Sequence, residues 1–146
     1  MAVSDLAARP AGQVDLIDAL VRTSFATMAV LTRIAAEHDL SLTQLRMLAI
    51  LRDRRVKMSE LADYLGLDKS TISGLADRAE RRGLLQRAAN PLDGRGIDVL
   101  LSADGTELAA RGAAQIARAM SPMTSALTRA EARRLTTLLE RMLDPG

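Results

Sequence analysis

Small polar side chains gather in the stretch DKSTISGLADRAERRGLL, residues 68–85. Asp68 can cap a helix that starts with the hydroxyls of Ser70, Thr71 and Ser73 and continues through Gly74. A helix start of this kind could hydrogen-bond an anionic partner, because its free N–H groups and its dipole favour negative charge. The same stretch also fits an ordinary solvated helix face, and both interpretations stay open from these residues alone.

The apolar residues of this stretch follow a helical period. Ile72, Leu75, Ala76 and Ala79 recur at i, i+3, i+4 and i+7, which predicts one buried stripe. The opposite face carries polar, small or charged residues: Lys69, Ser70, Thr71, Ser73, Gly74, Asp77, Arg78 and Arg81.

The segment before this helix predicts a second, shorter one. Ser59 can cap SELADYL, Leu61 and Leu65 face inward, and Gly66 suits a left-handed helix end. Two helices joined by a tight glycine-containing turn form a helix-turn-helix.

After Gly83 the period changes to that of strands. LLQRAA and IDVLLS read as two strands, and Ile97, Val99 and Leu101 alternate in the second. Between them NPLDGRG contains the turn dipeptides Asn-Pro and Asp-Gly. The sequence therefore predicts a β-hairpin whose polar tip covers residues 90–96.

Helical patterns flank this central block. One runs from Val14 to about Glu37, and a second, capped by Thr43 or Ser41, buries Leu45, Leu48, Ala49 and Leu51. Behind the hairpin, Ser102 can cap a helix that Pro122 ends or kinks. Thr128 and Glu131 form a capping box for a final helix. The first helix is so apolar that it needs a large partner surface, which a second subunit could supply.

Composition limits the kind of protein. The 146 residues are 48% hydrophobic but only 1% aromatic, which favours packing of helices on helices. Cysteine is absent, so disulfides, thiolate metal sites and cysteine-based oxidant sensing are excluded. No signal-peptide pattern or membrane-length apolar run occurs, and a cytoplasmic protein is expected. Residues 41–100 hold eleven Lys and Arg against eight Asp and Glu, so positive charge is concentrated in the central block.

The central block resembles the MarR family of bacterial and archaeal transcriptional regulators. The matching stretches are LTQLRMLAIL (42–51), MSELADYLGLDKSTISGLADRAERRGLLQR (58–87), NPLDGR (90–95) and VLLSADG (99–105). Gly66, the Ser70-Thr71 pair, Asp77-Arg78, Arg82-Gly83-Leu84 and the Asp93-x-Arg95 tip occur in the order and spacing of that family. The similarity extends from about residue 14 to 143, in pattern rather than in letters at both ends.

The resemblance implies a mainly α fold with a small β-hairpin wing, a winged helix-turn-helix joined to a helical dimerisation region. The expected parts are a flexible arm (1–12), a dimerisation helix (13–40), a winged helix-turn-helix domain (41–101) and C-terminal dimerisation helices (102–146). The implied function is sequence-specific binding of double-stranded DNA by a homodimeric repressor at a pseudo-palindromic operator, with release by a small-molecule effector. The alternative is a winged helix that serves only protein–protein contact.

The expected DNA contacts divide between recognition helix and wing. The short residues at the helix start suit the major groove, and Arg78 lies one turn further along the same face. At the wing, the resemblance implies that Arg95 enters the minor groove and that Asp93 steadies it. The full expected set is Ser59, Lys69, Ser70, Thr71, Ser73, Gly74, Arg78, Arg87, Asp93 and Arg95. Arg81 and Arg82 could instead pair with acids such as Asp77 or Glu80.

An effector would bind where dimerisation helices meet the winged domain, as the resemblance implies. The residues proposed to line such a site are Met28, Leu31, His38, Met47 and Tyr64, although methionines at helical spacing more often belong to a core. We expect no cofactor, no metal site and no enzymatic activity, because the sequence offers no nucleophile–base set, Gly-rich phosphate loop or ligand cluster.

Overall fold

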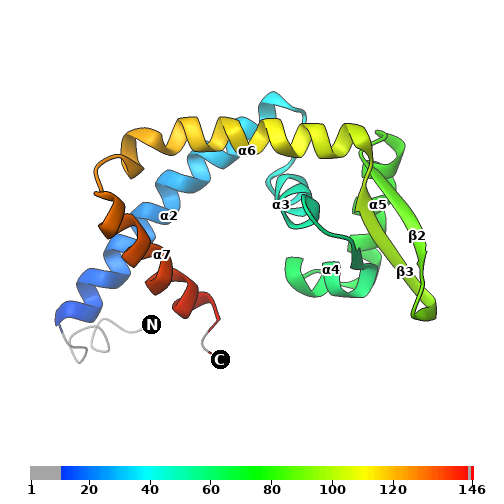
Figure 1. Ribbon diagram of the computed structural model, residues 1–146, viewed down its shortest axis with the longest axis horizontal. Coiled ribbons are helices and arrows are strands. Elements are labelled where there is room, and N and C mark those ends of the chain that lie inside the picture. The colour runs from blue at the N-terminus through cyan, green and yellow to red at the C-terminus, as the bar shows by residue number, and fades with distance from the viewer. Residues whose placement is uncertain (1–10, 145) are drawn as a thin grey trace.

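The computed structural model describes residues 11–144 and 146. Its elements follow in the order α2 (Ala11–Glu37), α3 (Leu42–Leu51), β1 (Val56–Lys57), α4 (Met58–Leu65), α5 (Lys69–Arg81), β2 (Leu85–Asn90), β3 (Asp93–Leu101), α6 (Ala103–Thr124) and α7 (Arg129–Leu143). Figure 1 shows α3, α4, α5 and the β2–β3 hairpin gathered at one end, with α6 leading from them to α7 at the other. The predicted fold class, a winged helix-turn-helix joined to a helical region, is confirmed.

The sheet differs from the prediction at the tip of the hairpin and in having an additional short strand. Its strand order is β1-β3-β2, all antiparallel. Within the predicted tip over residues 90–96, Asn90 pairs with Asp93 across the turn of Pro91 and Leu92. The register then shifts, so that Ala89 pairs with Ile97 and residues 94–96 form a bulge in β3. The tip is therefore a short turn followed by a bulge. The short strand β1, whose Val56 pairs with Val99, was not predicted from the sequence.

Most predicted helix caps are confirmed. Ser41 and Thr128 each form a capping box, and Asp68 and Ser102 accept backbone N–H bonds at the starts of α5 and α6. The Ser59 cap is wrong: α4 begins at Met58, and Lys57 occupies the N-cap without a side-chain bond. The reason is β1, which delivers an extended chain at that point and starts the helix earlier.

The hydrophobic core lies inside the winged domain and beneath the first half of α6. Its fully buried larger side chains are Met47, Leu48, Leu51, Leu61, Ile72, Leu85 and Val99. Ala49 was predicted to be buried but is exposed, whereas Met47 is only 1% exposed. Because α3 contacts α2 and α6 as well as α4 and β3, it buries a wider arc than a single stripe.

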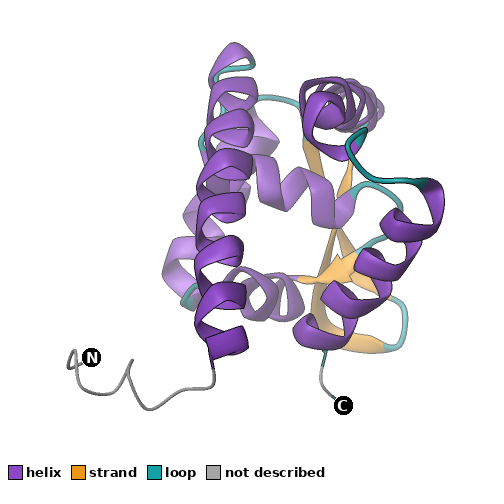
Figure 2. Cartoon of the chain, turned by 90° about the vertical axis from the view of Figure 1, so that its left-hand side faces the viewer, coloured by secondary structure: helices purple, strands orange, loops and turns teal. Residues whose placement is uncertain are grey.

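The outer helices bury little of their apolar surface. Leu135, Leu139 and Met142 of α7 are all exposed, and no residue of α7 is buried within the described chain. On α2 the exposed apolar side chains are Leu16, Ile17, Val21, Phe25 and Met28. Both helices stand in front of the rest of the chain in Figure 2. Within the part of the chain that the structure describes, no other element covers these faces.

The start of α2 and the end of α6 also differ from expectation. Helix α2 already begins at Ala11, so it includes the end of the arm predicted over 1–12, whose residues 1–10 lie outside the described residues. Pro122 lies inside α6, which continues two residues further to Thr124, so the helix does not end at the proline itself. Within the described residues, no helix has the length and apolar character needed to cross a bilayer. The proposed division into domains stays a prediction.

Candidate nucleic-acid interface

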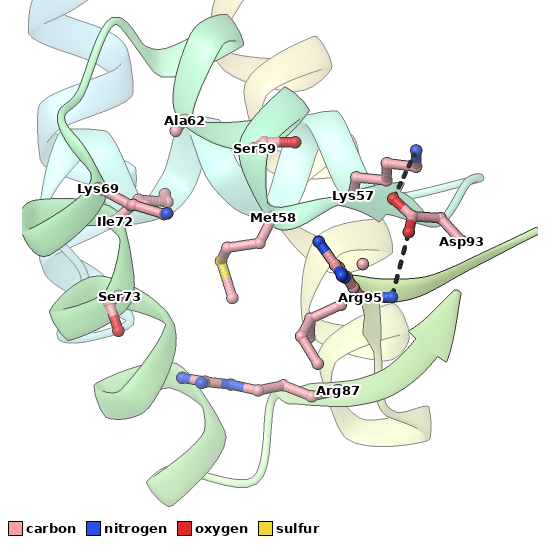
Figure 3. Close-up of a pocket in the computed structure, with 12 residues that line it drawn as sticks. Lys57, Met58, Ser59, Ala62, Lys69, Ile72, Ser73, Arg87, Asp93 and Arg95 are labelled. Atoms are coloured by element: carbon pink, nitrogen blue, oxygen red, sulfur yellow. Dashed lines mark hydrogen bonds and ion pairs between the residues drawn. The ribbon is translucent and has the colours of Figure 1, made fainter.

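Helices α4 and α5 and the hairpin enclose an open hollow of about 420 Å³ (Figure 3). Its lining comprises Lys57, Met58, Ser59, Ala62, Lys69, Ile72, Ser73, Arg87, Asp93, Arg95, Gly96 and Ile97. Six residues of the predicted DNA-contact set meet here, from three elements that are separate in sequence: Ser59, Lys69, Ser73, Arg87, Asp93 and Arg95. Four cationic side chains against one carboxylate make this hollow suitable for an anion.

The other predicted contacts lie along the exposed face of α5, beside the hollow. At its start the Asp68 carboxylate accepts the Thr71 N–H at 2.7 Å and the Ser70 hydroxyl at 3.0 Å. These bonds hold the pKa of Asp68 below its ordinary value, and the bond from the Thr71 backbone contributes most. The donor of the Ser70 hydroxyl is therefore used by the cap, and its oxygen is left to accept a bond from a partner.

Gly74 leaves room for the next cationic side chain on the helix. A Cβ atom built at this position would lie 3.5 Å from Nη1 of Arg78. The Arg78 guanidinium thus folds back over the glycine, on the face that points away from the core. A Cβ at this position would make an ordinary contact with Arg78, so the placement of Arg78 does not require the glycine.

A Gly74→Ala variant should unfold at a higher temperature. Alanine favours a helix interior by about 0.5–1 kcal/mol over glycine, and its Cβ would make only an ordinary van der Waals contact with the end of Arg78. We expect thermal unfolding to shift upward by a few degrees, while affinity for operator DNA falls only if the backbone at Gly74 approaches the DNA too closely for a methyl group. A lower melting temperature would contradict this account of Gly74.

Asp93 organises the backbone at the wing. Its Oδ1 accepts the N–H of Arg95 at 3.1 Å, and its Oδ2 lies 3.6 Å from Nζ of Lys57. The carboxylate therefore fixes the main chain that carries Arg95 and leaves the guanidinium free to point into the hollow (Figure 3). Lys57 was not among the predicted contacts, because no pattern in the sequence indicates β1, the strand that places it there.

Arg87 is held by the recognition helix itself. It forms ion pairs with Asp77 and, at 3.3 Å, with Glu80, both of α5. The pairing suggested for Arg81 and Arg82 is wrong, because β2 brings Arg87 to these acids first. Arg81 instead bonds weakly to a carbonyl of its own helix, at 3.4 Å. Arg87 therefore has less free charge for a phosphate than Lys69 or Arg95 has.

A buried carboxylate anchors the base of the wing. Asp98, only 4% exposed, accepts bonds from Asn90 at 2.7 Å and from Nε of Arg55 at 2.8 Å. The Asn90 bond first, and then Arg55, lower the pKa of Asp98 against the opposing effect of burial. The predicted alternation of Ile97, Val99 and Leu101 puts Asp98 on the opposite face of the strand from these apolar residues. The sequence therefore showed no sign that its carboxylate is buried.

An Asp98→Asn variant should lose stability at neutral pH but much less in acid. A lowered pKa in the folded chain stabilises the fold fully above the ordinary value of 3.8, and this contribution is lost as the pH falls through the folded value. Urea unfolding of both chains from pH 7 down to below 3.8 tests this. The difference between them should shrink in acid, and a difference independent of pH would contradict it.

The five proposed effector residues do not line one cavity. Met47 is buried in the core, Leu31 packs against it, and Met28 and Tyr64 are 46% exposed. His38 alone of the five borders a smaller hollow of about 200 Å³, together with Arg111, Ala114, Gln115 and Arg118. Among the described residues, no three His, Asp or Glu side chains gather as a metal ion would require.

Comparison with known proteins gives matches over the central block. Residues 38–96 match the family model described as "MarR family". A regulator of Bacillus subtilis, the "Uncharacterized HTH-type transcriptional regulator YfiV", is 30% identical over 71 residues, 48% of this chain and 44% of that protein. The chain thus matches less than half the length of this curated relative.

Solved structures extend the likeness to the whole fold. NadR in complex with 4-hydroxyphenylacetate superposes with a TM-score of 0.76 at 20% identity, over 86% of this chain and 90% of NadR. A MarR mutant from E. coli complexed with operator DNA gives 0.69 at 22% identity, over 90% and 96% of the two chains. The fold is shared at these identities, and the family match over residues 38–96 confirms the resemblance found in the sequence.

Proposed function

Starting from residues 38–96 as a MarR-family segment within a MarR-type fold, we propose that the protein is a DNA-binding transcriptional regulator. One observation carries the proposal. Six residues predicted as DNA contacts from sequence line a single hollow between α4, α5 and the hairpin. The exposed face of α5 continues from that hollow through Thr71 and Arg78. A helix beside a cationic wing fits one major groove and the neighbouring backbone.

In this proposal the residues divide by task. Helix α5 enters the major groove, and the backbone phosphates pass over the hollow near Lys69 and Ser59. Arg95 reaches the minor groove on the main chain that Asp93 holds. Modest positive charge means that specificity depends on this geometry as well as on attraction. Such a regulator works in the cytoplasm, where it meets DNA, and needs neither cofactor nor catalytic group.

We further propose a homodimer formed by α2, α6 and α7. The exposed apolar side chains of α2 and α7 support it, since a second copy would remove them from water. Two winged domains related by a twofold axis would read a pseudo-palindromic site with half-sites about one helical turn apart. Repression is the proposed outcome of binding, by competition for the promoter.

A Leu139→Asp variant should be monomeric. Leu139 lies on the exposed apolar face of α7, so a charge there costs little in a single chain but is costly inside an interface. Sedimentation equilibrium should give twice the chain mass for wild type and the chain mass for the variant. Thr137→Asp, on the opposite side of α7, is the matched control and should stay dimeric. A wild-type monomer would overturn the proposal.

Release by a small molecule is a finer proposal. NadR was crystallised with 4-hydroxyphenylacetate, and a regulator of the same fold can be expected to respond to a ligand of its own. The ligand would bind where α2 and α6 meet the winged domain, near Leu31 and His38. Met47, which is buried in the core, could join such a site only if the core at α3 opened, whereas Met28 and Tyr64 are already exposed.

Binding to DNA from immediately upstream of the protein's own gene tests the main proposal. Fluorescence anisotropy should give tighter binding to this fragment than to scrambled DNA. The affinity should fall steeply with salt, as expected when about 6–10 phosphates are neutralised per dimer. Two results together would favour the alternative of a protein-binding winged helix. The first is equal affinity for both fragments, and the second is that selection from a pool of random duplexes enriches no sequence.

A further inference from the structure

The turn that ends α5 joins the recognition helix to α2 and to α6. At its first residue, Arg82 donates hydrogen bonds from Nη1 to the Asp39 carbonyl at 2.9 Å and from Nη2 to the His38 carbonyl at 3.0 Å. These carbonyls lie just beyond α2, where a helix end leaves acceptors unsatisfied and carries partial negative charge. The planar guanidinium presents its two donors to both carbonyls in a fixed fork, a geometry that the ammonium of a lysine does not supply.

The chain after α2 is unusual enough to need such support. Asp39 adopts φ = 55°, a left-handed conformation that residues with a Cβ rarely occupy. The following N–H, that of Leu40, bonds back to the Ala35 carbonyl at 2.9 Å and closes the helix end. Arg82 thus stabilises a strained corner at which α2 turns into the winged domain.

The next two residues of the same turn contact α6. Ser102 donates from its hydroxyl to the Gly83 carbonyl at 2.6 Å and from its N–H to the Leu84 carbonyl at 3.0 Å. On the far side of the corner, His38 hydrogen-bonds Gln115 of α6 at 2.6 Å. A connected set of bonds therefore runs from the end of α5 through Arg82 to α2 and α6.

We propose that Arg82 is a positioning residue that fixes the orientation of the recognition helix relative to the dimerisation helices. It does not line the hollow, and both of its terminal nitrogens donate to protein carbonyls, so this role does not require contact with DNA. In a dimer, any rocking of each winged domain about the α2 corner changes the spacing of the two α5 helices. Arg82 thereby sets which half-site spacing the dimer accepts, an inference that rests on the proposed function.

The matched control is another arginine of the same chemistry. Nη2 of Arg46 on α3 donates to the Tyr64 carbonyl near the end of α4 at 2.8 Å. This bond joins two helices within the winged domain and does not involve α2. Arg82→Met and Arg46→Met each remove guanidinium bonds while keeping most of the side-chain length, but only the first releases the corner.

The DNA measurement compares an operator with the same operator lengthened by one base pair between half-sites. Arg82→Met should reduce the ratio of the two affinities by about fivefold or more, a typical coupling between sites. Its salt dependence should match that of wild type, because no phosphate contact is lost. Arg46→Met should preserve the ratio, and an unchanged ratio in Arg82→Met would overturn the role in spacing.

A spin-label measurement tests the orientation without DNA. The chain has no cysteine, so Ala26→Cys on α2 and Asp63→Cys on α4, both exposed, give one pair of nitroxide labels per chain. Refolding with excess unlabelled chain isolates the distance within a chain. Wild type and Arg46→Met should give one narrow distance distribution, and Arg82→Met a broader one.

Arg82→Lys serves if the methionine variant does not fold. It should also broaden the distribution, since an ammonium on a flexible stem lacks the fixed planar fork that holds both carbonyls. An unchanged width in the folded Arg82 variants would overturn the inference. Because the label distances need neither DNA nor operator, a chain that failed to bind DNA would refute the proposed function and leave this result standing.

Discussion

A Gly105→Ala variant is expected to lose about 3 kcal/mol of unfolding free energy, the upper end of the range of about 1–3 kcal/mol that is typical of overpacking. Gly105 is buried in the first turn of α6, and a Cβ there would lie 2.9 Å from the carbonyl carbon of Leu84 and closer still to its oxygen. This carbonyl belongs to the turn after α5 and already accepts the Ser102 N–H. Backbone on both sides must move, and the ordinary gain of alanine in a helix cannot offset that cost.

Gly112 in the same helix is the matched control. It is also buried, but a Cβ there would meet only Cδ1 of Leu45, at an ordinary 3.9 Å. Gly112→Ala should therefore stabilise by about 0.5–1 kcal/mol. Calorimetry should place the two melting temperatures on opposite sides of wild type, with Gly105→Ala lower by about 5–10 °C. Equal shifts for the two variants would show that the close approach at Leu84 is not rigid.

Local signals in the sequence were enough to define most of this fold. The period of Ile72, Leu75, Ala76 and Ala79 gave the buried face of α5, and each residue is buried as predicted. Asp68 and Gly66 bracket the turn of the helix-turn-helix because their roles depend on neighbours within a few residues. Elements set by short-range chemistry can be read from one sequence.

Features that depend on distant partners could not be read in this way. The strand β1 exists because β3 offers Val56 a pairing edge. Asp98 is buried because Arg55 and Asn90 reach it from other segments. The partners of two arginines were missed for the same reason. Arg87 pairs with the acids of α5 that had been suggested for Arg82. Arg82 bonds to carbonyls beyond α2, because the tertiary fold brings those within its reach.

The candidate site shows the same division. The ten predicted DNA contacts came from spacing and resemblance, and six of them share one hollow because α4, α5 and the hairpin converge there. Lys57 was missed, although it faces Asp93 at 3.6 Å. The proposed effector residues stay a prediction. Helical spacing alone could not show that one of them, Met47, is only 1% exposed in the core of the single chain.

Arg95→Ala should cause the largest loss of DNA binding of any single substitution in the chain. An arginine that contacts bases contributes about 1–3 kcal/mol, and the proposed dimer presents two wings, so the affinity for operator should fall by at least about 30-fold. The slope of log affinity against log salt should also become shallower by about one per arginine removed. Unfolding should change little, because the Arg95 side chain is exposed at the wing.

Two further variants separate the kinds of contact that Arg95 makes. Arg95→Lys keeps the charge, so its salt slope should equal that of wild type. Its preference for operator over scrambled DNA should recover only in part, since an ammonium lacks the planar fork of a guanidinium. Arg22→Ala removes a charge from the outer face of α2, where Arg22 pairs only with Asp18 of its own helix, and should bind as wild type does. If Arg95→Ala bound operator as tightly as Arg22→Ala, the wing would not reach DNA, and the free guanidinium over the hollow would need another partner.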